Sequence, residues 1–301
     1  MTQRYESPEA FKQALEARIR RAARESSVDM GRFRQLLVFD RFLARVFEEL
    51  PNRVVVKGGI VLELRLERAR TTRDVDLRVM GDPDGLLEAL QHAGRRDLGD
   101  FLSFIIVPDA KHPTIEGDGI VYDGRRFRAE ARLAGKVYGM TFGIDAGFGD
   151  VLTAEPEIIS GTTFLDFIDV KPAMFRVYPR EAHIAEKLHA YTLPRSRENS
   201  RVKDLPDLAL LGLTGPFDAA SLREAVQKTF AFRNTHSVPT RFPSPPASWE
   251  PIYARMATED ALPWSTLDAL VRAVRAFLDP LLGNVDGTWA PESWAWSRAE
   301  T

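Results

Sequence analysis

Apolar and polar residues follow two different periods along the chain, and the change of period predicts two parts. Before about residue 178, short apolar runs and alternation with a period of two predict several strands. After it, apolar residues recur every three or four positions, as in amphipathic helices. A chain of 301 residues is also long enough for about two domains. We therefore predict a sheet-containing domain over residues 1–178 and a mainly helical domain over residues 179–301.

The first part opens with two predicted helices. Ser7-Pro8 is a helix start, with Ser as the N-cap and Pro at the first helical position, and it predicts a helix over Glu9–Ser27. Helical spacing of Phe and Leu predicts a second helix over Arg32–Leu50, which Pro51-Asn52 ends. The arginines of the first helix fit either a solvated face or a basic rim for RNA or a partner protein.

Four or five strands follow, with few helices among them. They are expected at Val54–Val56, Asp74–Val79, Phe101–Val107, Phe127–Leu133 and Gly139–Gly147, with helices at Ile60–Ala69 and Leu86–His92. This order favours an α+β fold with a mixed sheet over a doubly wound parallel one. In the second part, helices are expected at Glu181–Tyr191, Lys203–Leu211, Ser221–Thr229 and Pro263–Leu282, with a Pro- and Ser-rich loop at Ser237–Trp249.

Composition narrows the class of protein. The formal charge of −2 provides no global attraction to nucleic acid, although a local basic patch remains open. The absence of cysteine excludes disulfides, thiolate metal sites and a Cys nucleophile. No run approaches the ~18 apolar residues of a membrane span, and the N-terminus lacks the apolar segment of a signal peptide. We expect a cytoplasmic protein without a membrane partner.

Candidate chemistry is concentrated in the stretch Val54–Val79. An apolar strand ends at Lys57-Gly58-Gly59, and a later strand carries Asp74 and Asp76 two positions apart, hence on one face. Mg²⁺ typically takes one or two carboxylates together with substrate phosphates, and backbone N–H groups at a glycine turn can hold a phosphate. The stretch therefore predicts a Mg²⁺ (or Mn²⁺) and phosphate site, in which Lys57 either contacts phosphate or caps its strand.

Several later residues fit the same chemistry, each with a plainer alternative. Asp145 is either a third metal-binding carboxylate or a residue at a strand end. Lys187 either neutralises triphosphate charge or faces solvent. Asp204 and Asp207 share a helix face as site acids or as first-turn acids favoured by the helix dipole.

Two arginines flank the carboxylate pair, and two histidines lie near Lys187. Arg70 and Arg73 either hold an anionic substrate or pair with nearby acids. His183 and His189 are six positions apart, which is not the spacing of helical metal ligands, so packing or surface roles are expected.

Five motifs in order carry a family resemblance over residues 50–210. They are K-G-G-x-x-L-x-L from Lys57, then R-T-T-R-D-V-D-L, F-G-I-D-A, E-A-H-I-A-E-K-L-H-A and R-x-K-D-L-x-D-L. Together they resemble the AbiEii/AbiGii-type nucleotidyltransferase toxins, which include the MenT toxins. The resemblance implies a fold like that of DNA polymerase β with a helical C-terminal part.

The resemblance also implies roles for individual residues. Gly58 and Gly59 match the glycine turn, Asp74 and Asp76 the metal-binding pair, Lys187 the family lysine and Asp204 the later acid, while Asp145 matches a strand Asp. The broader superfamily has Gly-Ser at the turn, whereas this chain has Gly-Gly, with fourteen residues between Gly59 and Asp74. Backbone N–H groups, Lys57 or Thr72 are expected to replace the missing Ser.

The resemblance implies a toxin of a toxin–antitoxin system that transfers nucleotides from NTP to the tRNA 3′ end, with NTP, tRNA and a cognate antitoxin as partners. Two alternatives remain open. One is nucleotidyl transfer to a protein or small-molecule hydroxyl, which the same metal site would serve. The other is a non-catalytic module that binds nucleic acid or a partner through the basic N-terminal helices.

Overall fold

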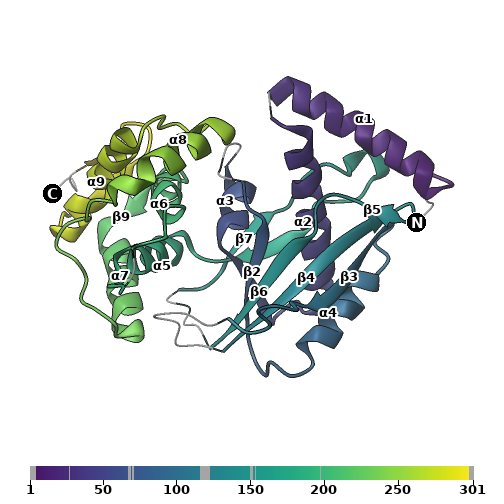
Figure 1. Cartoon of the computed structure of the whole chain (residues 1–301), viewed down its shortest axis with the longest axis horizontal. Coiled ribbons are helices and arrows are strands. Elements are labelled where there is room, and N and C mark those ends of the chain that lie inside the picture. Colours follow the sequence, from purple (N-terminus) through teal and green to yellow (C-terminus); the bar gives the residue numbers. More distant parts are fainter. Residues whose placement is uncertain are drawn as a thin grey trace.

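A mixed sheet and a helical region lie side by side along the longest axis of the protein (Figure 1). The structure is a computed structural model, and it describes residues 5–26, 28–66, 69, 71–115, 123–149, 152, 154–196 and 198–297. The strand order of the large sheet is β3-β4-β6-β2-β1-β8-β7, with β5 paired to β4. Its strands are β1 (Val54–Lys57), β2 (Asp74–Val79), β3 (Leu102–Pro108), β4 (Gly124–Leu133), β5 (Lys136–Val137), β6 (Phe142–Phe148), β7 (Glu157–Ser160) and β8 (Met174–Val177).

Parallel and antiparallel pairs alternate across the middle of this sheet. β2 runs parallel to β6 and antiparallel to β1, and β1 in turn runs parallel to β8. β4 is antiparallel to both β3 and β6, and β7 is antiparallel to β8. The mixed sheet of an α+β fold, expected from the sequence, is confirmed.

Helices cover one face of the sheet and leave charged side chains on the other. The helices of this half are α1 (Pro8–Ser26), α2 (Met30–Glu49), the short α3 (Gly59–Arg65) and α4 (Leu86–Arg95). Phe39 and Phe42 of α2 contact the ring of Phe142 at 5.1 and 5.2 Å between centroids. On β2, Val75 and Leu77 are fully buried, whereas Asp74 is exposed, so the predicted alternation holds.

A buried ion cluster ties α2 to the start of β3. Asp100 accepts hydrogen bonds from Arg45 at 2.5 and 2.9 Å and from Arg41 at 2.7 Å, and all three side chains are buried. Arg45 also donates to the carbonyl oxygen of Leu102 at 2.6 Å. Asp100, together with Asp40 at 3.7 Å from Arg41, thus balances two guanidinium groups that would otherwise be buried uncompensated.

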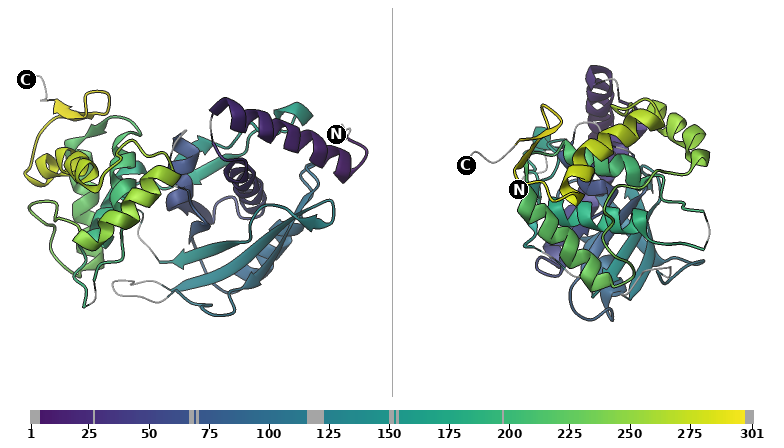
Figure 2. Two further views of the ribbon diagram at one scale, coloured as in Figure 1. Left: turned by 45° about the horizontal axis from the view of Figure 1, so that its top comes forward. Right: turned by 90° about the vertical axis from the view of Figure 1, so that its left-hand side faces the viewer.

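The helical region has its own core. It contains α5 (Arg180–Thr192), α6 (Asp204–Gly212), α7 (Ala219–Arg233), α8 (Glu250–Glu259), α9 (Leu267–Leu282) and a small sheet of β9 (Phe217–Asp218), β10 (Thr288–Ala290) and β11 (Ala295–Ser297). The indole N–H of Trp289 donates to the Gly212 carbonyl at 2.8 Å, and that of Trp296 donates to the Phe277 carbonyl at 2.8 Å. The Trp-rich tail therefore packs on α6 and α9. Figure 2 shows its strands, drawn in yellow, at the same end of the molecule as α9.

The expected elements are present with bounds shifted by a few residues, and several others were not expected. The unexpected elements are β5, β7, α8, the short 3-10 helices η1 (Asp166–Ile168) and η2 (Ala247–Trp249), and the small sheet. Most are two to four residues long, which is too short for a period of apolar residues to be recognised in the sequence. None of the described helices is long and apolar enough to cross a membrane.

Replacing Asp100 tests whether the buried ion cluster holds α2 on the sheet. Asp100→Asn leaves Arg45 without a counter-charge and Arg41 with Asp40 alone, 3.7 Å away, so we expect the free energy of unfolding to fall by about 3–5 kcal/mol. Urea denaturation followed by circular dichroism measures this. Asp97→Asn, at a nearby exposed position, is the matched control and should change it by less than about 0.5 kcal/mol. Equal effects of the two substitutions would contradict the role of the cluster.

Candidate active site

The strand register brings three carboxylates to one face of the sheet. Asp76 on β2 lies opposite Asp145 on the parallel strand β6. On its other side, Asp76 lies opposite Lys57, the last residue of β1. Asp74 lies two residues before Asp76 and on the same face. The three residues predicted to bind metal are therefore neighbours, and Lys57 borders them.

Two glycines lie beneath the carboxylates of β2. Gly58 has a φ of +74°, and a Cβ at this position would lie 1.8 Å from Asp76 Oδ2. A Cβ at Gly143 on β6 would lie 2.4 Å from Asp74 Oδ1. Each carboxylate thus occupies the space that a side chain would otherwise fill, which explains the need for glycine at both positions.

Crowding changes the acidity of Asp76. Burial, first, and then the neighbouring charges of Asp145 and Asp74 raise its pKa, Lys57 and Lys187 oppose the shift, and the net result is a pKa of about 6. The side chain is partly accessible to water. Repulsion of this kind is relieved by a cation bound between the carboxylates.

Asp145 has a protein partner for both of its oxygens. Arg126 on β4 donates from Nε to Asp145 Oδ1 at 2.8 Å and from a terminal nitrogen to Oδ2 at 3.0 Å. This bidentate pair fixes the carboxylate and neutralises part of the charge facing Asp76. Asp145 lies where the sequence predicted, but coordination of a metal through it would require the Arg126 bond to be exchanged.

The helical region supplies a second cluster. Lys187 on α5 contacts Asp204 Oδ1 at 3.0 Å and Asp207 Oδ2 at 2.7 Å, both on α6. Asp207 is completely buried, and Asp204 is also approached by Arg201 at 3.8 Å. Among the described residues, Asp204 Oδ2 has no hydrogen-bond partner. The two acids therefore hold the Lys187 ammonium, while the buried Oδ2 of Asp204 faces Arg201 without a hydrogen bond among the described residues.

Part of each cluster lines one cleft of about 190 Å³, whereas Asp74, Asp145 and Asp207 do not line it. Gly58 and Asp76 come from the sheet, and Lys187 and Asp204 from the helices. Of the described residues that line the cleft, five are cationic: Lys57, Lys187, Arg195, Arg201 and Arg233. Such a cleft is suited to a polyanion beside a carboxylate pair.

Other predicted residues lie nearby without lining this cleft. Gly59 is buried as the first residue of α3. The backbone N–H of Thr72 donates to Glu63 Oε1 at 2.6 Å, and its hydroxyl donates to the Asp74 carbonyl at 3.2 Å. Arg73 is exposed just before β2. A phosphate contact by the Thr72 hydroxyl would require the bond to Asp74 to be exchanged. Arg70 lies outside the described residues.

Some residues of the site were not singled out by sequence reasoning. Glu186 on α5 lies within 4.0 Å of Lys57, receives a hydrogen bond from Tyr178 at 3.1 Å and pairs with Arg233 at 3.1 Å. The sequence feature that could have identified Glu186 is its position directly before Lys187. Arg126 and Arg233 gave no local signal, because only the strand and helix packing brings them to the acids they bind.

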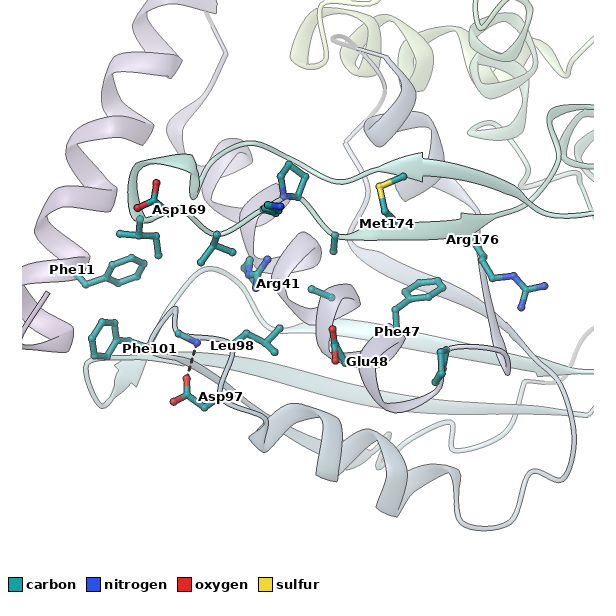
Figure 3. Close-up of a pocket in the computed structure, with 18 of the residues that line it drawn as sticks. Phe11, Arg41, Phe47, Glu48, Asp97, Leu98, Phe101, Asp169, Met174 and Arg176 are labelled. Atoms are coloured by element: carbon teal, nitrogen blue, oxygen red, sulfur yellow. Dashed lines mark hydrogen bonds between the residues drawn. The ribbon is translucent and has the colours of Figure 1, made fainter. Parts of the chain in front are cut away.

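A larger groove lies elsewhere, between α2 and the strand β8. It has a volume of about 1240 Å³, with Phe11 and Phe101 toward one end and Met174 and Arg176 toward the other (Figure 3). None of the predicted site residues lines it. Size alone therefore does not indicate the site, whereas the convergence of charged groups does.

The donor chemistry of the site fits a hard divalent cation. Within the described ranges, no three His, Asp or Glu side chains are placed to hold a metal by themselves. Mg²⁺ commonly uses only one or two carboxylates and takes its remaining ligands from water and substrate phosphates. Asp74 and Asp76 meet that requirement. The pKa of Asp76 is raised because its carboxylate is buried beside other carboxylates.

Comparison with known proteins agrees with this geometry. A family model described as "Nucleotidyl transferase AbiEii toxin, Type IV TA system" matches residues 41–286. The chain belongs to the AbiEii nucleotidyltransferase toxin family. Both the sheet site and the helical site lie inside the matched segment, so the AbiEii family resemblance read from the motifs is confirmed.

Solved structures add evidence for the fold. MenT4, a nucleotidyltransferase toxin of Mycobacterium tuberculosis H37Rv, superposes with a TM-score of 0.57 at 16% identity over 93% of each chain. A nucleotidyltransferase from H. pylori gives a TM-score of 0.44 at 15% identity over 82% of this chain and 97% of its own. No curated protein matches the sequence. At 16% identity the likeness to MenT4 shows a shared fold.

The raised pKa of Asp76 leads to a pH-dependent stability prediction. Its ordinary pKa is 3.8, so the metal-free folded state binds this proton more tightly than the unfolded state, and stability falls as pH rises toward and past 6. Asp76→Asn removes the charge. We expect it to raise Tm by roughly 2–4 °C at pH 8, or about 1 kcal/mol, and by less at pH 5.

Thermal unfolding in EDTA at both pH values measures this effect. Asp84→Asn, at an exposed loop position, is the control and should change Tm little at either pH. An equal gain from Asp76→Asn at pH 5 and pH 8 would show that charge crowding is not its source.

Proposed function

We propose that this AbiEii family member is a metal-dependent nucleotidyltransferase that transfers a nucleotide from NTP to the 3′ end of tRNA and so blocks translation. The strongest support is the single cleft in which Asp76 of the sheet faces Lys187 and Asp204 of the helical region. A carboxylate of the sheet beside several cations suits a nucleotide triphosphate with a divalent cation.

Asp74 and Asp76 are the residues that would hold Mg²⁺ or Mn²⁺. The ion supplies charge neutralisation and polarisation at the reacting phosphate when it is bound. Gly58 lets the backbone lie close to Asp76, and Lys57 and Gly59 complete the proposed phosphate-binding turn. Arg73 and Thr72 stand at the edge of this set. We propose that these two residues border the path by which the substrate reaches β2.

Cationic side chains place the triphosphate. Lys187 lies within reach of the Asp76 charge, which its own charge partly offsets. Because Asp207 is buried and contacts its ammonium at 2.7 Å, Lys187 is held in one place. A fixed positive charge stabilises negative charge that develops on the phosphates without reorganisation at the moment of reaction.

A base is needed for the attacking hydroxyl. Asp204 lines the cleft, and its Oδ2 has no hydrogen-bond partner among the described residues. We assign it to accept the hydroxyl proton, a role that requires hydrogen-bond reach of the acceptor. Asp145 is a neighbour that would join the metal site only after release from Arg126.

We also propose how the chain is organised and where it acts. Residues 1–178 form the nucleotidyltransferase domain, and residues 179–301 form a second domain that contributes Lys187 and Asp204. The two hydrophobic cores support this division, since one is built from Phe11 to Val177 and the other mainly from Ile184 to Trp289. A cytoplasmic location and a cognate antitoxin follow from the proposed role.

Loss of Asp74 tests the enzyme directly. Asp74→Ala removes a metal-binding carboxylate from an exposed strand position, so the fold should persist while transfer falls by at least about 100-fold. Purified protein is incubated with Mg²⁺, each labelled NTP and total tRNA, and incorporation is measured. EDTA should abolish the wild-type signal.

Asp84→Ala is the matched control and should retain incorporation. Full incorporation by Asp74→Ala would refute the assignment. Label in cell protein or a small molecule, with none in tRNA, would favour transfer to another hydroxyl. Binding of nucleic acid that ignores both Mg²⁺ and Asp74 would favour a non-catalytic module.

A further inference from the structure

A buried histidine lies in the cleft without a hydrogen-bond partner. His183 is on α5, one turn before Lys187, and only 2% of its surface is exposed. Neither ring nitrogen has a partner among the residues that the structure describes. His183 is one of the residues that line the same cleft as Lys57, Gly58 and Asp76.

An imidazole with both nitrogens unsatisfied is unusual in a protein interior. Buried polar groups are hydrogen-bonded in the large majority of cases, and each exception requires an explanation. His189, on the same helix and equally buried, has a partner for one ring nitrogen, because its Nε2 lies 2.8 Å from the Thr235 hydroxyl, whereas only its Nδ1 has none among the described residues. The sequence predicted packing or surface roles for both histidines, and a packing role alone leaves the two nitrogens of His183 unexplained.

The surroundings of His183 favour its neutral form. Burial, first, and the charges of Lys187, Arg65 and Lys57 lower its pKa against the opposing charge of Asp207, with a net pKa of about 3. A neutral imidazole has one N–H donor and one acceptor nitrogen. In a cleft already lined by cations, such a ring provides a donor without adding a positive charge that Lys187 would repel.

We infer that His183 is a phosphate-binding residue whose ring N–H donates a hydrogen bond to the triphosphate of the bound nucleotide. The inference rests on the proposed function, because it takes the cleft to be the NTP site. A triphosphate attracted by the five cations of the cleft would lie beside the ring N–H of His183, which has no hydrogen-bond partner among the described residues. His183 contacts the substrate and takes no proton from it.

The side chain offers a matched set of variants. His183→Leu keeps the volume and removes the donor, whereas His183→Gln and His183→Asn keep an N–H near one or the other ring nitrogen. Because Leu removes an unsatisfied buried polar group, His183→Leu should leave the Tm of the ligand-free protein unchanged or raise it.

Binding is measured by calorimetry with Mg²⁺ and either inorganic triphosphate or each NTP. We expect His183→Leu to weaken the binding of both ligands by about tenfold or more, as for the loss of one hydrogen bond to a charged group. At least one of His183→Gln and His183→Asn should bind both ligands with an affinity within about threefold of the wild type.

A Leu variant that binds both probes like the wild type would overturn the inference, as would weakened NTP binding with unchanged triphosphate binding. If His183→Leu does not fold, the ¹⁵N resonances of the His183 ring in the wild type decide, since they must shift on addition of inorganic triphosphate. Failure of the wild type to bind any NTP would instead refute the proposed function.

Discussion

Repulsion among carboxylates on neighbouring strands is the constraint on which the site depends. Asp76 lies opposite Asp145 in register and two residues after Asp74, and burial together with these neighbouring charges raises the pKa of Asp76 to about 6. Backbone pairing in the middle of a sheet holds these groups together against their repulsion. The fold keeps a concentration of negative charge that a flexible loop would disperse.

The rest of the structure balances and directs that charge. Arg126 neutralises Asp145 from within the sheet, whereas Lys187 acts on Asp76 from α5, across the cleft. Lys187 is itself placed by Asp204 and Asp207 on α6. The helical region is therefore more than a neighbour of the sheet, because it supplies the positive wall of the cleft.

Local sequence patterns predicted much of this arrangement. Period-two alternation gave the face of Asp74 and Asp76, and helical spacing gave α5 and α6 with Lys187, Asp204 and Asp207, because these features depend on residues close in the chain. The Arg126 bond to Asp145, the placement of Gly143 under Asp74 and the burial of His183 depend on pairing and packing between distant segments. No local pattern contains that information, and the same holds for short strands such as β7.

The central claim is that carboxylates of the sheet and cations of the helical region form one nucleotide and metal site. Electron paramagnetic resonance of Mn²⁺, titrated with and without NTP, tests it most directly. The account predicts that NTP tightens Mn²⁺ binding, that Asp76→Asn removes most of this binding, and that Lys187→Gln weakens the effect of NTP. Mn²⁺ binding that is indifferent to NTP and to both substitutions would contradict it.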